Sequence, residues 1–179
     1  LTLTWPEVTD DVGVTSIRVM MNGDELAALG PDVTTFEVID LSPWTDYGFS
    51  VAAQDAAENT TDTLETSLKT PDKSLPSWPA EAALEVVSLT AISATLAWPD
   101  AQDDVEISSY TLRMGEEVIA SLGGDTTEVE VTDLSPWTEY SFSLVASDPA
   151  GNVSAEPLTA ELKTPDGGPP TWPADAALT

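Results

Sequence analysis

A seven-residue segment occurs twice in this chain, 93 residues apart. The sequence LSPWTDY at 41–47 returns as LSPWTEY at 134–140, so Trp44 and Trp137 have the same place in two copies (137 − 44 = 93). Other short motifs return at nearly the same distance, including KTP at 69–71, which recurs 94 residues later (163 − 69 = 94). A fixed period of this length is too long for a solenoid repeat and indicates tandem copies of one small domain.

The second copy contains seven short segments in which apolar and polar residues mostly alternate, with turn residues between them. Alternation with a period of two is typical of strands that are buried on one face only. Seven such strands predict an all-β domain made of two packed antiparallel sheets. The expected strands are residues 83–87, 94–98, 109–114, 118–122, 128–131, 140–146 and 158–162.

Specific residues in these segments resemble fibronectin type III domains, in the form common in bacterial extracellular proteins. They include Trp5 and Trp98, the two Leu-x-Pro-x-Thr-x-Tyr segments, and DPAGN at 148–152. The resemblance implies tandem immunoglobulin-like (fibronectin type III) seven-stranded β-sandwiches, with strands A to G. It also implies that Tyr47 and Tyr140 form tyrosine corners, whose hydroxyl ties strand F to the preceding loop.

The alignment of the copies sets the expected domain boundaries. Residues 1–72 are predicted to be a repeat that lacks strand A, because residue 1 aligns with Ala94 in the second strand of the complete copy. Residues 73–166 are predicted to be a complete repeat with an N-terminal linker, and residues 167–179 a linker and the start of the next strand A. We expect a window of a longer repeat protein. The alternative is donor-strand assembly, in which the tail of one copy fills the missing strand of the next.

The net charge of the chain limits the kinds of partner that it is expected to bind. There are 32 acidic and 5 basic residues, a net charge of −27, and no histidine or cysteine. Binding to nucleic acid or to anionic membrane surfaces is therefore not expected, and cations, glycans and basic proteins are the favoured partners. Direct membrane insertion is not expected either, because no apolar run is long enough to span a membrane. The absence of histidine and cysteine excludes the commonest general base, cysteine nucleophiles, and any Ser-His-Asp or Cys-His arrangement. No other catalytic set is evident, so an enzyme is not expected. The acidity itself fits solubility, salt adaptation or cation binding.

Acidic residues in the loops of the second copy suggest calcium. The B–C and F–G loops are expected to meet where strand A enters the domain, and Ca²⁺ takes six to eight oxygen ligands. Ordinary turn-capping by aspartate and asparagine is the alternative explanation. The candidate ligands are Asp72, Asp100, Asp103, Asp104, Asp148 and Asn152.

Four tryptophans fall in loops and linkers rather than in strands. Trp44 and Trp137 lie in the E–F loops, and Trp78 and Trp172 lie in the proline-rich linkers. We expect Trp44 to pack near Trp78, and Trp137 near Trp172, which would stiffen the joints between domains. The alternative is that these exposed aromatic rings stack on sugars.

The sequence thus predicts an extracellular protein, secreted or held at the cell surface. Its expected function is structural or adhesive: a rod, stalk or fibre whose partners are neighbouring repeats, other copies of itself or glycans. The first alternative is an accessory or glycan-binding module of a secreted polysaccharide-degrading enzyme. Exposure of Trp44 or Trp137 would favour a module that binds glycans or proteins, whereas burial of both at joints would favour the rod.

Overall fold

The structure, a computed structural model, describes residues 1–173 and contains thirteen strands and no helix among them. Residues 174–179, which include most of the predicted start of a further strand A, lie outside the described residues. The chain divides into two compact units, residues 1–72 and 73–179. Within the described part, no helix is long and apolar enough to cross a membrane.

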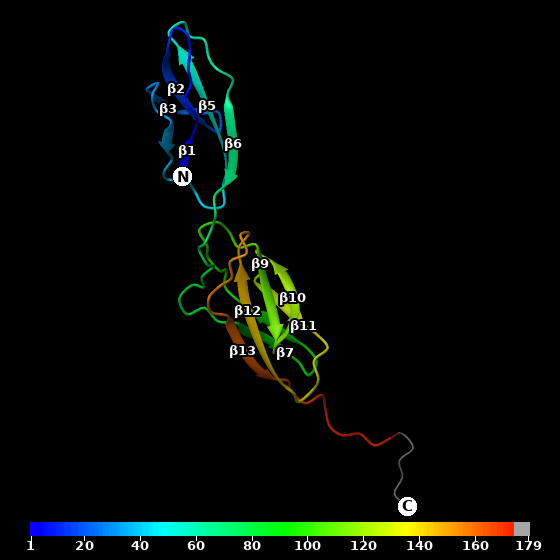
Figure 1. The fold of residues 1–179 in the computed structure, drawn as a ribbon. Helices are drawn as coiled ribbons and strands as arrows, with labels where there is room; N and C mark the ends of the chain where they lie inside the picture. The colour runs from blue at the N-terminus through cyan, green and yellow to red at the C-terminus, as the bar shows by residue number, and fades with distance from the viewer. Residues whose placement is uncertain (174–179) are drawn as a thin grey trace, which may run out of the picture. The chain divides into compact units, whose positions relative to one another are not determined.

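The first unit has two antiparallel sheets with six strands in all. The four-stranded sheet has the order β3 (Asp24–Leu29), β2 (Val14–Met21), β5 (Asp46–Asp55), β6 (Leu64–Lys69). The two-stranded sheet pairs β1 (Thr2–Thr4) with β4 (Thr35–Glu37) (Figure 1). Asn22 and Gly23 join β2 to β3 with positive φ at both residues, which is what the tightest hairpin turn requires.

The second unit has seven strands in the same arrangement, with one strand added to its smaller sheet. The four-stranded sheet has the order β10 (Glu117–Gly123), β9 (Ser109–Met114), β12 (Glu139–Ser147), β13 (Leu158–Lys163) (Figure 1). The three-stranded sheet has the order β11 (Glu128–Val131), β8 (Ala94–Ala97), β7 (Glu85–Leu89). The added strand is β7, which corresponds to strand A.

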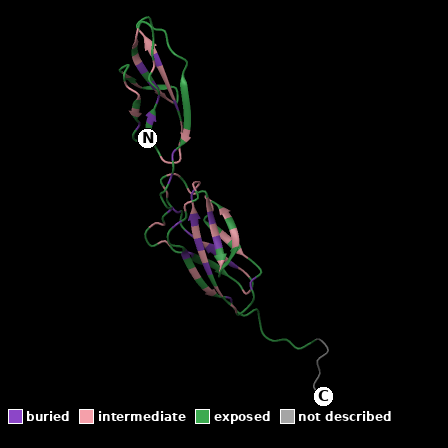
Figure 2. Ribbon diagram, in the orientation of Figure 1, coloured by how far each residue is buried: buried purple, intermediate pink, exposed green. Residues whose placement is uncertain are grey.

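Each unit has its own core, which forms because apolar residues recur at every second position of the central strands. Along β12, Phe142, Leu144 and Ala146 are buried, and the residues between them are more exposed (Figure 2). In the first unit, Ile17 and Val19 of β2 are fully buried in the same way. Burial of such side chains is the main favourable term in folding of each sandwich.

The predicted strands agree with the structure except at the first. Residues 83–87 were expected to form it, but β7 runs from Glu85 to Leu89. The cause lies in the preceding turn, where the N–H of Ala82 donates to the carbonyl of Pro79 and Glu81 has a φ of 64°. Leu84 is buried in the core before the strand pairing starts. The apolar run therefore includes a residue, Leu84, that packs in the core but does not belong to the hydrogen-bonded strand β7.

Candidate functional site

The E–F loop of each unit holds a tryptophan in a left-handed backbone conformation. Trp137 has a φ of 53° and Trp44 a φ of 47°. A bulky residue pays a steric cost there, and such strain persists only where the surroundings hold it in place. Because the same conformation occurs in both units, it is a regular feature of this E–F loop.

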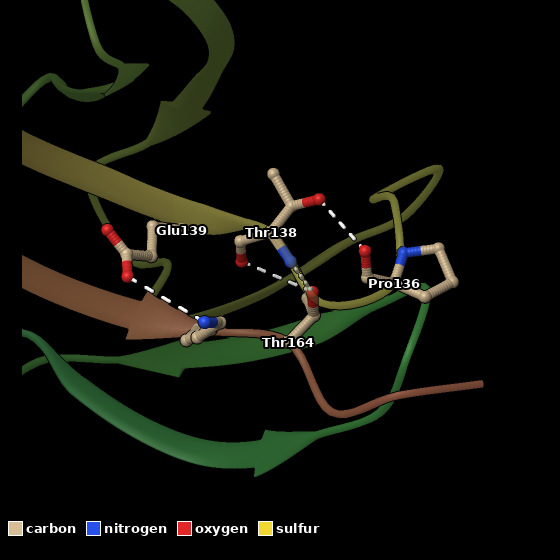
Figure 3. Close-up of polar contacts among 5 residues, drawn as sticks. Pro136, Thr138, Glu139 and Thr164 are labelled. Atoms are coloured by element: carbon tan, nitrogen blue, oxygen red, sulfur yellow. Dashed lines mark hydrogen bonds and ion pairs between the residues drawn. The ribbon is translucent and has the colours of Figure 1, made fainter. Parts of the chain in front are cut away.

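The hydroxyl group of Thr164 holds the loop of the second unit. This residue follows β13 and is 0% exposed. Its Oγ1 donates to the carbonyl of Ser135 at 2.6 Å and accepts from the N–H of Thr138 at 2.9 Å. Thr138 in turn donates through its own hydroxyl to the carbonyl of Pro136 at 2.9 Å (Figure 3). Buried hydrogen bonds of this kind are costly to break, so the loop is fixed on both sides of Trp137.

The first unit repeats this network. The Oγ1 of Thr70 donates to the carbonyl of Ser42 at 2.6 Å and accepts from the N–H of Thr45 at 2.9 Å. Thr70 is 9% exposed, so its network is somewhat less shielded than that of Thr164. The recurring Lys-Thr-Pro motif therefore supplies the threonine that locks each E–F loop.

Tyrosine hydroxyls tie the start of each F strand to the same loops. The hydroxyl oxygen of Tyr47 accepts from the N–H of Ser42 at 3.0 Å, and that of Tyr140 accepts from the N–H of Ser135 at 2.8 Å. This bond from a strand-F tyrosine to the backbone a few residues upstream is the geometry of a tyrosine corner. Each loop is thus held by one tyrosine and one threonine.

A lysine lies over each tryptophan ring. The Nζ of Lys163 is 4.1 Å from the centroid of Trp137, and the Nζ of Lys69 is 4.0 Å from that of Trp44. A cation in this position is attracted by the electron-rich face of the ring, worth about 0.5–1 kcal/mol at an exposed site. Lys163 also lies 3.9 Å from a carboxylate oxygen of Glu139 (Figure 3). We call the Trp137 ring with Lys163 and Glu139 the Trp137 platform.

The Trp137 platform is open to solvent and adjoins a shallow groove. The Trp137 side chain is 65% exposed, whereas Trp44 is half-buried. The groove, about 550 Å³, runs along the paired ends of β12 and β13. Its lining residues are Glu139, Tyr140, Ser141, Glu161, Leu162 and Lys163. An exposed aromatic ring beside hydroxyl and carboxylate groups suits a polar ligand with apolar faces.

Only some of the calcium ligands predicted in the second unit lie close to one another in the structure. Asp103 and Asp148 have carboxylate oxygens within 4.8 Å of each other, in the B–C and F–G loops. Asp100 and Asp104 are exposed and do not join that pair. Asp72, the last residue of the first unit, is buried. The structure therefore brings together two of the carboxylates predicted within this unit.

Asn152 organises the F–G loop around Asp148 instead of standing apart as a ligand. Its side-chain amide donates to Oδ2 of Asp148 at 2.7 Å, and its backbone N–H donates to Oδ1 at 2.9 Å. Burial of Asp148, which is 3% exposed, works to raise its pKa, but these hydrogen bonds and those from the backbone outweigh it and hold the pKa below its ordinary value. Asp148 is thus a charged loop anchor whatever else it binds.

The first unit has the same anchor at its surface. The amide of Asn59 donates to Oδ2 of Asp55 at 2.7 Å, and this bond is the largest cause that lowers the pKa of Asp55. Between the two, Glu58 adopts a φ of 66°, where the second unit has Gly151 with a φ of 90°. Glu58 therefore takes the left-handed conformation that glycine adopts freely.

The two linker tryptophans have different surroundings. Trp78 stacks on Tyr110 of its own unit, with ring centroids 5.8 Å apart, and its Nε1 donates to the carbonyl of Glu156 at 3.0 Å. Trp172 is 86% exposed. The pairings expected between Trp44 and Trp78 and between Trp137 and Trp172 stay predictions.

Sequence reasoning missed two features of the site, the lysine over each ring and the threonine behind each loop. The signal was present, because Lys-Thr-Pro recurs at 69–71 and 163–165 with the period of the tryptophans. By itself the motif indicates only the repeat, because nothing in it names the partner of its lysine or its threonine. A residue at the end of strand G reaches the E–F loop only when β13 pairs with β12, so its partner cannot be read from the linear order.

Comparisons with known proteins agree with this architecture. The sequence profile of the Fibronectin type III domain matches residues 79–161. Chitinase A1 of Niallia circulans is 31% identical over 189 aligned positions, which cover 100% of this chain and 26% of the relative. Exoglucanase B of Cellulomonas fimi is 30% identical over 94% of this chain and 16% of the relative. The chain thus spans about a quarter or less of these relatives.

A solved structure adds a further likeness. Chitinase ChiA74 from Bacillus thuringiensis is 31% identical with a TM-score of 0.48, over 55% of this chain and 15% of that one. The second unit is a fibronectin type III domain, as its profile match and strand order establish. The first unit repeats the strand order, the tyrosine corner and the threonine lock with six of the seven strands.

Proposed function

We propose that this chain is a non-catalytic accessory segment of an extracellular polysaccharide-degrading protein and that the Trp137 platform contacts the polymer. The exposed Trp137 ring on a fixed loop is the observation that carries the proposal. Relatives named chitinase and exoglucanase, which match all or nearly all of the chain, support this choice over an isolated rod.

The chemistry of the platform suits a sugar chain. Lys163 covers one face of the indole, so the opposite face is the one that a sugar ring would meet. Sugar rings present C–H groups that pack on aromatic faces and hydroxyl groups that donate to carboxylates. Glu139 and Glu161 line the adjoining groove and supply such acceptors. A neutral polymer also avoids the repulsion that the net charge of −27 imposes on anionic ones.

Depletion assays on insoluble chitin and on crystalline cellulose test this proposal. The full chain should bind at least one of the polymers, and Trp137→Ala should weaken binding about tenfold, the ratio that corresponds to about 1.4 kcal/mol. Trp44→Ala should have a smaller effect, because the Trp44 ring is half-buried.

Val118→Ala provides the matched control, because it removes an exposed apolar side chain from β10, away from the platform. Binding of this variant should equal that of the original chain. Absence of binding to both polymers, or equal binding by the Trp137→Ala and Val118→Ala variants, would leave the chain as a spacer in which the platform has no role.

Calcium binding by the acidic loops stays a separate prediction. The proximity of Asp103 and Asp148 is what favours it. A cation that binds only the folded state raises its unfolding temperature, so about 1 mM Ca²⁺ should stabilise the second unit by several degrees. Calorimetry at constant ionic strength, with Mg²⁺ and Asp103→Asn as controls, checks this. Equal shifts with both ions would assign the acidity to solubility or salt adaptation.

A further inference from the structure

The outer face of β12 and β13 carries a further carboxylate beside the Trp137 platform. In this strand pair Glu139 stands opposite Lys163. The next pair on the same face is Ser141 with Glu161, because side chains two positions apart on a strand point to the same side of the sheet. Glu161 is exposed and lines the groove of about 550 Å³ that adjoins the platform. The groove is therefore lined by two carboxylates and one ammonium group.

Glu161 has no cationic partner among the described residues. The ion pairs in that part of the chain join Arg18 to Glu25 and Lys163 to Glu139. A carboxylate without a counter-charge attracts a cation, and the net charge of −27 extends this attraction beyond the groove. The place beside Glu161 thus suits a positively charged group of a ligand.

The chain already holds one ammonium group of its own at the platform. The Nζ of Lys163 lies 4.1 Å from the centroid of the Trp137 ring and 3.9 Å from a carboxylate oxygen of Glu139 (Figure 3). An aromatic face and a carboxylate together therefore attract an ammonium group here. The opposite face of the exposed Trp137 ring and the carboxylate of Glu161 offer the same two kinds of group to a ligand.

The first unit provides a comparison within the same chain. The strand position that corresponds to Glu161 is Ser67 there, and it stands opposite Gly48. The ring of Trp44 is also less exposed than that of Trp137. The additional carboxylate beside an open aromatic ring is therefore a feature of the second unit.

We propose that the Trp137 platform, together with Glu161, prefers polysaccharides whose sugar units carry free amino groups over polysaccharides whose units are neutral. This inference rests on the proposed function, in which the platform contacts a sugar chain. The C–H face of a sugar ring would pack on the indole, and its amine would lie beside the Glu161 carboxylate. An amine that is attached near electron-withdrawing groups titrates close to neutral pH, so it carries a positive charge at about pH 5.5.

Titrations of the full chain followed by NMR test the proposal. The probes are soluble oligomers of glucosamine and of N-acetylglucosamine with the same linkage, which differ only in the acetyl groups that remove the charge. At about pH 5.5 and low salt, the glucosamine oligomer should bind about two- to fivefold more tightly, as expected for one exposed ion pair. The difference should shrink as salt increases. The backbone amide signals of Ser141 and Glu161 should shift, and those of Gly48 and Ser67 should not.

Two variants should change the preference in opposite directions. Glu161→Gln removes the unpaired carboxylate and should abolish the preference for the glucosamine oligomer. Lys163→Gln removes the ammonium group that repels the sugar amine and should increase the preference. Glu130→Gln is the matched control, because it makes the same change of charge at an exposed position of β11 in the other sheet. The preference of this control should equal that of the original chain.

The inference and the proposed function can fail separately. Weaker binding of both oligomers by Trp137→Ala tests the proposed function, whereas the ratio of the two affinities tests the inference. Equal binding of the two oligomers, or no binding of the glucosamine oligomer, overturns the inference even if Trp137 contacts an insoluble polymer. A preference that Glu161→Gln and Glu130→Gln reduce alike also overturns it, because the net charge alone would then be the cause. So does tighter binding at the same signals of a lysine oligomer of equal charge, which would assign the groove to basic peptides.

Discussion

The two units share their E–F loops almost bond for bond but differ at the opposite end of the sandwich. Thr70 and Thr164 make the same hydrogen bonds, and a lysine covers the tryptophan ring in both units. At the other end, the second unit has Trp78 and β7, for which the described part of the first unit has no counterpart. The E–F loop is therefore held by contacts that both units contain, whereas packing at the strand-A end of the second unit depends on the segment that precedes β7.

The largest expected effect concerns Trp78, which precedes β7 in the second unit. Trp78→Ala should lower the free energy of unfolding of the second unit by about 2–3 kcal/mol, because a half-buried ring leaves a cavity against Tyr110. The first unit should unfold at an unchanged temperature. Calorimetry that resolves two transitions checks this, and Trp78→Phe should restore part of the loss. Destabilisation of both units alike would show that the segment is shared between them.

The threonine locks should rank next. Thr164→Val removes a buried hydroxyl with a donor and an acceptor partner and should cost about 2 kcal/mol in the second unit. Thr70→Val should cost less in the first unit, because Thr70 is closer to solvent. Chemical denaturation measures both, with the serine variants as controls that keep the hydroxyl. A larger loss of unfolding free energy for Thr70→Val than for Thr164→Val would contradict the expected ranking of the two threonines.

A smaller effect is expected where the F–G loops differ. Gly151→Ala should destabilise the second unit by about 1 kcal/mol, because its φ of 90° disfavours any side chain. Glu58→Gly should stabilise the first unit by up to about the same amount, since it relieves a left-handed glutamate. Thermal unfolding of the two variants should shift in opposite directions. Shifts of the same sign would mean that the side chain of Glu58 contributes to stability.

The smallest expected effect concerns pH. Burial works to raise the pKa of Asp148, but the hydrogen bonds from Asn152 and from the backbone of Gly151 and Ala150 together outweigh it, so folding lowers this pKa. Its contribution to stability is therefore complete above the unfolded pKa, near 3.8, and is lost as the pH falls through the lower folded value. Asp148→Asn should flatten the acid dependence of unfolding for the second unit. Asp55→Asn should do so for the first, and an unaltered slope in either variant would refute the anchor role.

Much of the fold follows from the sequence because strand patterns and turn residues are local. The alternation at 109–114 and at 128–131 coincides with β9 and β11 to the residue. The placement of β7 does not follow, because Leu84 satisfies the same pattern by packing ahead of the ladder. Apolar periodicity reports which residues are buried, and the pairing of backbone groups is a separate event.

The candidate site was harder to predict from the sequence than the fold, because the residues that contact one another in it are distant in the chain. The sequence identified Trp137 and Tyr140 through the repeat, yet Lys163 and Thr164 meet them only across β12 and β13. Among the acidic residues, nothing in the linear order separates Asp103 from its exposed neighbour Asp104. Side-chain direction in a loop depends on the backbone conformation that the packed sheets impose.

The sequence by itself determined that this chain is a tandem array of all-β domains with an acidic surface, because period, alternation and charge are properties of the linear order. Only the tertiary structure decided that Trp78 packs within its own domain, whereas Trp137 is exposed to solvent with a lysine over one face of its ring. The two residues look alike in the sequence, as tryptophans beside proline. What separates them is the presence of a facing ring in one place and of solvent in the other, and packing alone creates that difference.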